Sequence, residues 1–137
     1  MVNKAYPDTS KMVFVFGSNE SGFHGGGAAA YAYKHKGARW GFSYGHMGQS
    51  FAIPTKSQHI AGTLPLRLIK KYVDGFLAYA AGHPEIQFQV TCIGCGLAGL
   101  QHEDVAPMFD GAPDNCWFDG KWALHTGIRE DRIWGAG

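Results

Sequence analysis

The spacing of apolar residues along the chain predicts short strands separated by helices. Residues 12–16, MVFVF, are continuously apolar, which is typical of a strand buried on both faces of a parallel sheet. The segments 49–56, 87–93 and 115–118 are predicted to form further strands, and we expect the first of these to stop at Pro54.

Between the predicted strands, apolar residues recur at helical intervals. Residues 63–82 form the clearest predicted helix, with Pro65 suited to its first turn and Gly82 to its end. Its apolar face carries Leu66, Ile69, Val73, Phe76, Leu77 and Ala80. The alanine-rich segment 28–36 predicts a second helix, and residues 102–109 predict a short helical turn. This order of elements predicts an α/β fold with a mostly parallel central sheet.

Length and composition fit one globular domain. The chain has 137 residues, of which 45% are hydrophobic and 17% charged. We expect a single domain over 1–137 with its core at about 12–118, while residues 38–48 are predicted to be a loop and 125–137 to be loosely ordered.

Charge and hydropathy bear on partners and location. The net charge of +1 is too small to indicate nucleic-acid binding from electrostatics alone. The first residues lack the apolar segment of a signal peptide, and no apolar run is long enough to cross a bilayer. We therefore expect a cytoplasmic protein without a membrane partner; the oligomeric state is not predicted.

The cysteines do not indicate a disulfide scaffold or a metal site. There are three, and Cys92 and Cys95 form a single C-x-x-C without the second ligand pair of a zinc site. A thioredoxin-like pair would lie at the start of a helix, whereas this one lies at the end of a predicted strand. We expect Cys92 to be a core residue and Cys95 a loop residue, and we predict no metal and no cofactor.

Two glycine-rich segments, 17–27 and 94–99, each follow a predicted strand. Ligands of parallel sheets bind at the carboxyl ends of the strands, and glycine lets backbone N–H groups approach them closely. One such loop is more often only a tight turn, but two on neighbouring strands favour an anionic ligand such as a pyrophosphate with its ribose. Phe23 and His24 follow Gly22 where a P-loop needs lysine, and too little chain follows the GxGxxG at 94–99 for a Rossmann unit.

Four motifs together resemble a macrodomain: FGSN at 16–19, HGGGAA at 24–29, AIPTK at 52–56 and IGCGLAGLQHEDV at 93–105. Their order and spacing match over roughly residues 12–110. The resemblance is greatest to terminal ADP-ribose glycohydrolases and to antitoxin macrodomains that remove ADP-ribose from DNA. It implies a three-layer α/β/α fold, and ADP-ribose or an ADP-ribosylated protein or nucleic acid as the partner.

The resemblance also implies which residues contact the ligand. Asn19 would reach the distal ribose, residues 25–27 would wrap around it, and the backbone of 94–99 would cradle the pyrophosphate. The complete set is Gly17, Ser18, Asn19, His24, Gly25, Gly26, Gly27, Gly94, Cys95, Gly96, Leu97, Ala98 and Gly99. The motifs do not say how adenine is held.

Lys56 matches the lysine that attacks, or otherwise acts at, the anomeric carbon in this subclass. A lysine amine becomes nucleophilic when it is desolvated or placed beside another cation, and in its charged form it can stabilise a leaving group. Some members pair this lysine with an aspartate, and Ala98 stands at that position here. Lys56 favours a hydrolase, whereas Ala98 favours a binding module without chemistry. A fold that binds only a protein partner is the third hypothesis.

Aromatic residues and one histidine near the glycine loops have open roles. His24 lies inside the first loop, where it would either contact ribose or act as an acid–base. Phe23, Trp40, Phe42 and Tyr44 would either stack on a base or cover the core. The sequence does not separate these alternatives.

Overall fold

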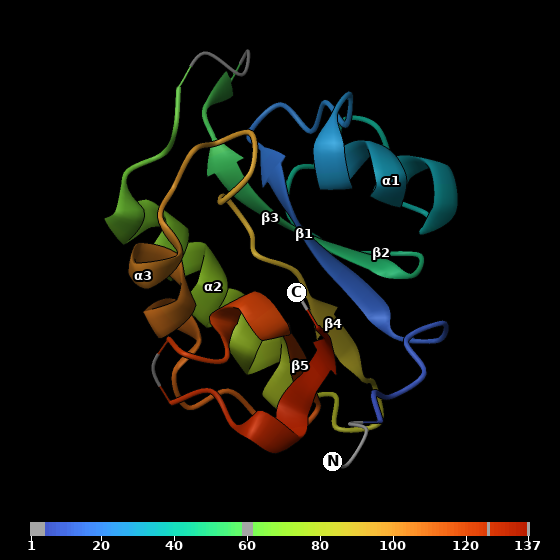
Figure 1. Cartoon of the computed structure of the whole chain (residues 1–137). Helices are drawn as coiled ribbons and strands as arrows, with labels where there is room; N and C mark the ends of the chain where they lie inside the picture. Colours follow the sequence, from blue (N-terminus) through green and yellow to red (C-terminus); the bar gives the residue numbers. More distant parts are fainter. Residues whose placement is uncertain (1–4, 59–61, 126, 137) are drawn as a thin grey trace.

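The computed structural model describes residues 5–58, 62–125 and 127–136 and contains a six-stranded sheet with helices on both faces (Figure 1). The strands are β1 (Val13–Asn19), β2 (Gly45–Met47), β3 (Ser50–Lys56), β4 (Phe88–Val90), β5 (Cys116–Asp119) and β6 (Ile133–Gly135). The α-helices are α1 (Gly27–His35), α2 (Leu66–Ala81) and α3 (His102–Val105), and the 3-10 helices are η2 (Ala106–Phe109), η3 (Gly120–Trp122) and η4 (Glu130–Arg132). The sheet order is β2-β3-β1-β4-β5-β6, and only the β2–β3 pair is antiparallel. The predicted α/β fold is confirmed.

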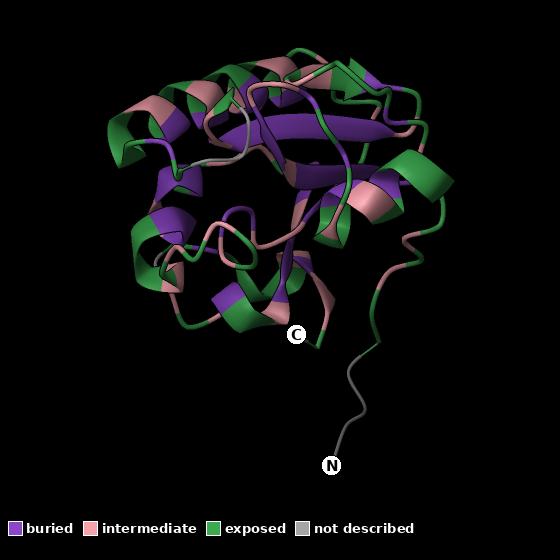
Figure 2. Cartoon of the chain, turned by 90° about the horizontal axis from the view of Figure 1, so that it is seen from above, coloured by how far each residue is buried: buried purple, intermediate pink, exposed green. Residues whose placement is uncertain are grey.

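Strand β1 separates two apolar layers because its side chains alternate between the faces of the sheet. Val13 and Val15 belong to the cluster that includes Phe76 of α2. Phe14 and Phe16 belong to a smaller cluster on the other face, with the alanines of α1. Figure 2 shows the buried residues concentrated along the central strands between the helical layers. Both faces of β1 are therefore covered, as its unbroken apolar sequence predicts.

Helix α2 is the element that the sequence describes best. Of the six residues on the predicted apolar face, four are buried and Leu77 is half-buried, whereas Leu66, in the first turn, is exposed. The buried residues are Ile69, Val73, Phe76 and Ala80. Pro65 is the N-cap rather than a residue of the first turn, because Thr63 still pairs with Lys56 beside the end of β3. No helix among the described residues is long and apolar enough to cross a membrane.

The prediction that β3 stops at Pro54 is wrong. The strand continues to Lys56, with Pro54 opposite Ser18 and Lys56 opposite Asn19. Pro54 is tolerated because pairing with β2 ends at Ala52 and the register with β1 shifts directly after it. This continuation brings Lys56 to the carboxyl end of the sheet.

Two short edge strands were not predicted. Strand β2 lies within 38–48, and β6 lies within the tail that was expected to be loosely ordered. Each has three residues, which is too short for a recognisable alternation of apolar and polar positions. β6 pairs with β5, and Ile133 joins the core, so the core extends beyond residue 118.

Candidate ligand-binding site

A cavity of about 740 Å³ lies at the carboxyl ends of β1, β3, β4 and β5. This is the edge at which open parallel sheets bind ligands. The predicted residues that line it are Gly17, Ser18, Asn19, Gly25, Gly26, Gly27, Lys56, Gly94, Cys95, Gly96, Leu97 and Ala98. Of the predicted residues, only His24 and Gly99 are absent from the lining. The structure therefore brings the two glycine loops and Lys56 to one place.

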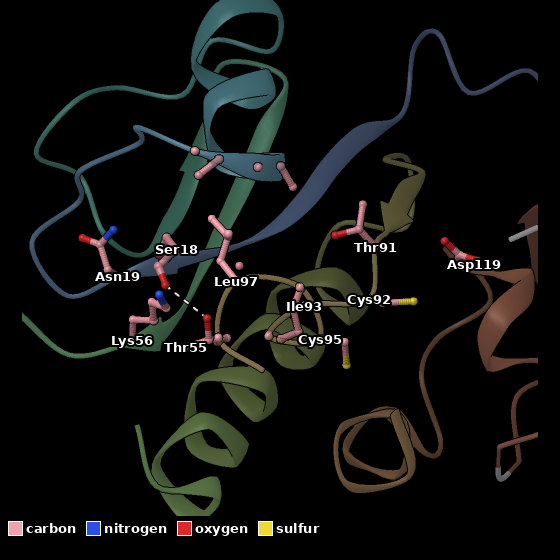
Figure 3. Close-up of a pocket in the computed structure, with 18 of the residues that line it drawn as sticks. Ser18, Asn19, Thr55, Lys56, Thr91, Cys92, Ile93, Cys95, Leu97 and Asp119 are labelled. Atoms are coloured by element: carbon pink, nitrogen blue, oxygen red, sulfur yellow. Dashed lines mark hydrogen bonds between the residues drawn. The ribbon is translucent and has the colours of Figure 1, made fainter. Parts of the chain in front are cut away.

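The two glycine loops are in close contact beneath and across the cavity. A Cβ atom on Gly17 would lie 3.1 Å from the backbone nitrogen of Gly94, so the base of the cavity has no room for a side chain there. Gly94 has a φ of +75°, a conformation that favours glycine. Farther out, the Leu97 Cδ1 atom lies 3.2 Å from where a Cβ atom of Gly26 would stand. Leu97 thus spans the gap between the loops (Figure 3).

Backbone N–H groups are available on both sides of this gap. Helix α1 begins at Gly27 without a side-chain cap and without an acidic residue in its first turn, so its first N–H groups have no such partner. In the second loop, the N–H groups of Gly96, Leu97 and Ala98 make no hydrogen bond within the described part of the chain. Thr63 Oγ1 donates to the Ala98 carbonyl at 2.8 Å and holds that loop. The arrangement suits an anion between the loops.

Lys56 lies at the end of the cavity formed by β3 and β1. Its backbone carbonyl accepts from the Glu20 N–H at 3.0 Å, which fixes the end of the strand. Its amine forms no ion pair with any described residue, and the described lining contains no carboxylate from either glycine loop. We call the part of the cavity that is lined by Lys56, Asn19 and Phe23 the Lys56 end.

Asn19 has a structural partner within the first loop. Its Nδ2 donates to the Phe23 carbonyl at 2.7 Å, and its Oδ1 accepts from the Phe23 N–H at 3.0 Å. The amide therefore holds the loop and places Phe23 at the rim. One Nδ2 hydrogen remains for the ribose contact that the resemblance implies.

The side chain of His24 is directed away from the cavity, contrary to the expected ligand contact. It is 1% exposed, its Nε2 is 2.8 Å from the Arg39 carbonyl, and its ring packs edge-on against Phe16 and Trp40. His24 therefore connects the first glycine loop to the segment after α1. Phe23, Trp40, Phe42 and Tyr44 are 38–53% exposed, so they do not serve mainly to cover the core.

The opposite end of the cavity was missed by sequence reasoning. It is lined by Thr91, Cys92, His102, Asp119 and Lys121, from β5 and from the segments that follow β4 and β5. Figure 3 shows Cys92 and Asp119 on the far side of the cavity from Lys56 and Asn19. His102 lies in the motif at 93–105, whereas Asp119 and Lys121 lie in no motif and reach the cavity through the parallel pairing of β4 with β5. We call the part of the cavity that is lined by Asp119, His102 and Lys121 the Asp119 end.

The thiols beside the cavity are poor nucleophiles. Burial, reinforced by the nearby Asp119 carboxylate, raises the pKa of Cys92 to about 12. Burial, reinforced by Asp104, raises the pKa of Cys95 to about 11. Both thiols are half-buried and line the cavity. Cys92 is therefore not enclosed in the core, as the sequence predicted, but partly faces the cavity. Within the described ranges, no group of three or more His, Cys, Asp or Glu side chains is arranged to hold a metal ion.

Comparison with known proteins identifies the fold. No family model matches the sequence, and no curated protein matches it. Among solved structures, Thermosipho africanus DarTG in complex with ADP-ribose is similar to this chain, with a TM-score of 0.57 and 15% sequence identity. The fold is macrodomain-like. The match covers 90% of this chain but 41% of the other, so this chain spans less than half of that protein's length. The macrodomain-like fold expected from the four motifs is confirmed.

Proposed function

We propose that this chain binds ADP-ribose along the cavity and releases it from a modified macromolecule by hydrolysis at the distal ribose. The observation that carries the proposal is the pairing of two N–H-rich loops with Lys56 at one end of the same cavity. The loops would hold the two phosphates, because backbone N–H groups at a helix start favour anions. The similar fold of DarTG, which was solved with ADP-ribose, supports this ligand.

In the proposed reaction, Lys56 acts where the anomeric carbon of the distal ribose meets the attached group. Water supplies the hydroxyl group that replaces the attached group, and the attached group leaves with the other proton. The amine of Lys56 has two possible roles. It attacks the carbon to form an intermediate that water then hydrolyses, or, when protonated, it stabilises the departing group electrostatically.

The experiment is a comparison of ADP-ribose binding and release for the unchanged chain and Lys56→Ala. We expect Lys56→Ala to bind free ADP-ribose within a few-fold of the unchanged chain but to release ADP-ribose at least 100-fold more slowly. Lys71→Ala, an exposed lysine of α2 outside the cavity, is the matched control. Equal turnover by Lys56→Ala would show that this lysine does not act in the reaction. Binding without turnover in the unchanged chain would favour the binding module.

The charge pattern of the sequence around Lys56 and the aromatic ring of Phe23 in the cavity lining favour nucleic acid over protein as the attached macromolecule. No Asp or Glu occurs between Glu20 and Asp74, although seven lysines and arginines lie in that interval. Phe23 lines the cavity and stacks on Trp40, with ring centroids 5.5 Å apart and planes 16° apart. Cations interleaved with exposed aromatic rings suit the phosphates and unstacked bases of a single strand.

The identity of the attached macromolecule is tested with two substrates, an ADP-ribosylated single-stranded oligonucleotide and an ADP-ribosylated protein. We expect faster release from the oligonucleotide, and a loss of that advantage as salt is raised, because the phosphate contacts are screened. Equal rates on both substrates, with no dependence on salt, would contradict the preference for nucleic acid. The proposal that the chain releases ADP-ribose would still stand.

A further inference from the structure

We infer that Cys92 and Cys95 are a site of reversible oxidation, and that a disulfide between them weakens ligand binding at the second glycine loop. The effect on binding rests on the proposed function, because it takes the ligand to be ADP-ribose. The disulfide itself rests on the geometry of the turn that the two residues form. Both thiols are free and half-buried, and both line the cavity.

A tight turn holds the two cysteines close together. The Cys95 N–H donates to the Cys92 carbonyl at 3.1 Å, so residues 92–95 form a β-turn. The φ of Gly94 is +75°, which a type II turn requires of its third residue. Such a turn keeps its first and fourth Cα atoms within about 7 Å, and disulfides join Cα atoms about 4.4–6.8 Å apart. Figure 3 shows the two side chains next to each other, and a charge on Cys95 would reach Cys92.

The third cysteine is not a competing partner. Cys116 is fully buried at the start of β5, where it pairs with Phe88 at the start of β4. Cys92 lies beyond the end of β4, four residues after Phe88. Four residues of extended chain span about 13 Å, which no disulfide can bridge. Oxidation of the folded chain should therefore join Cys92 to Cys95.

Oxidation by a low-molecular-weight disulfide closes the bridge in two exchange steps. Cys95, whose pKa of about 11 is the lower of the two, loses its proton to solvent, and its thiolate attacks one sulfur of the oxidant. The sulfur–sulfur bond of the oxidant breaks and releases one thiolate. Cys92 then loses its proton, attacks the Cys95 sulfur and releases the second thiolate. Each released thiolate takes up a proton, so the chain loses two hydrogen atoms and the oxidant becomes two thiols.

Burial makes the bridge slow to form but stable once it has formed. Burial raises the pKa of Cys92 to about 12 and that of Cys95 to about 11, so little attacking thiolate is present at neutral pH. The dithiol form therefore lacks the thiolate stabilisation that makes some cysteine pairs strong oxidants. The disulfide also places no negative charge beside Asp119 and Asp104, the carboxylates nearest to the two thiols. We expect a bridge that persists until a thiol reductant is supplied.

Closing the bridge would change the charge and the loop geometry around the proposed phosphate site. In the dithiol form, the Cys92 thiol forms a hydrogen bond with the Asp119 carboxylate, which is 7% exposed. The bridge removes that hydrogen and leaves a buried negative charge in the cavity lining with one donor fewer. The bridge also restrains Cys95, which leads directly into the N–H groups of residues 96–98. A diphosphate should therefore bind less favourably to the oxidised chain.

The experiment treats the folded chain with oxidised glutathione at about pH 9, where more thiolate is present, then removes the oxidant and measures the intact mass. The expected mass is lower by two hydrogen atoms. After denaturation, iodoacetamide should label Cys116 alone, which assigns the bridge to Cys92 and Cys95. Calorimetric titration with ADP-ribose then compares the reduced, oxidised and re-reduced chain. The oxidised chain should bind about tenfold more weakly, and dithiothreitol should restore the affinity.

The double variant Cys92→Ser/Cys95→Ser tests whether the bridge causes the change, because serine keeps a hydroxyl donor near Asp119 but cannot form a disulfide. Its affinity should be the same before and after treatment with the oxidant. Cys116→Ala is the matched control, because Cys116 does not line the cavity; it should respond to the oxidant as the unchanged chain does. Melting temperatures identify any variant that unfolds, and the unchanged chain alone gives both expected results.

An unchanged mass, or a stable adduct of glutathione on one cysteine, would overturn the inference, because the two thiols would then not reach each other. Equal affinity of the dithiol and disulfide forms for ADP-ribose would also overturn it. These results would leave the proposed function standing. Failure of the reduced chain to bind ADP-ribose would overturn the proposed function, and with it the effect on binding, while the mass would still decide whether the disulfide forms.

Discussion

The two ends of the cavity are built in opposite ways. The Lys56 end combines one cation, small residues and an exposed aromatic rim, and it comes from short contiguous stretches at the ends of β1 and β3. The Asp119 end combines a buried carboxylate with a histidine whose Nδ1 accepts a hydrogen bond from the buried indole of Trp122, and it comes from single residues of α3, β5 and η3. An open end with few fixed polar groups suits chemistry on varied attachments, whereas an end with a fixed donor and acceptor suits recognition of one constant group.

The largest expected effect comes from a substitution between the two ends. A ligand that reaches both ends would depend on the backbone N–H groups there. Gly26→Glu would introduce a carboxylate where the phosphates are proposed to bind. The φ of Gly26 is −150°, and the nearest atom to an added Cβ is the flexible end of Leu97, so the backbone should tolerate a side chain. We expect roughly 100-fold weaker binding of ADP-ribose by calorimetry, because two like charges about 4 Å apart repel by several kcal/mol at a protein surface.

Gly26→Gln is the matched control, since it adds the same volume without the charge. Its affinity for ADP-ribose should fall by much less than that of Gly26→Glu. Equal losses in the two variants would mean that space, rather than charge, governs this position, and the phosphates would then have to be placed elsewhere.

The same contrast explains what could be predicted from sequence. Residues 16–19, 24–29, 52–56 and 93–105 are contiguous, and the ends of parallel strands bring such stretches together, so their shared site was predictable. Asp119 and Lys121 carry no local signal; Asp119 enters the cavity only because β5 pairs beside β4. His24 lies in a predicted loop, yet its ring packs into the interior, because loop membership does not determine side-chain direction.

The cysteines give a second contrast, because Cys95 lies in the second glycine loop and Cys92 lies at the Asp119 end. With a pKa of about 11, Cys95 should react with iodoacetamide at pH 8 roughly 100-fold more slowly than a thiol at its ordinary value of 9.0, since only the thiolate attacks. Cys92, at about 12, should be slower still. Mass spectrometry of timed samples measures both rates, which should rise as pH increases toward these values.

Alkylation at the rate of a free thiol in the folded chain at pH 8 would contradict the burial of these groups. Bound ADP-ribose should slow the reaction further at both residues. Protection of Cys95 without protection of Cys92 would indicate a ligand that stops short of the Asp119 end.

Phe23 and Trp40 form the exposed aromatic rim of the Lys56 end. Substitution of Trp40 tests whether this end contacts the attached macromolecule. Trp40→Ala should slow release from an ADP-ribosylated oligonucleotide about tenfold, since stacking on one base is worth about 1–3 kcal/mol. Release from an ADP-ribosylated protein should change little. Trp40 is 50% exposed, so the melting temperature should fall only slightly.

Leu66→Ala is the control for this rim, because Leu66 is an exposed apolar residue on α2, at 40% exposure. It should slow neither reaction. Equal slowing of both substrates by Trp40→Ala would show that the ring supports the loop held by His24 rather than binding a base.

The smallest expected effect concerns Leu97, which joins the two sides of the cavity. Its side chain is 72% exposed, yet its Cδ1 lies against the Gly26–Gly27 segment, so it contributes to the site more than to the core. Leu97→Ala should weaken ADP-ribose binding about threefold to tenfold, mainly through faster dissociation, with little change in melting temperature. Leu97→Met, which nearly conserves volume, should behave like the unchanged chain. Stopped-flow measurements separate the two rates. If Leu97→Ala instead speeds association, the Leu97 side chain must move aside before the phosphates enter. That movement would then limit the rate at which ligand reaches both ends of the cavity.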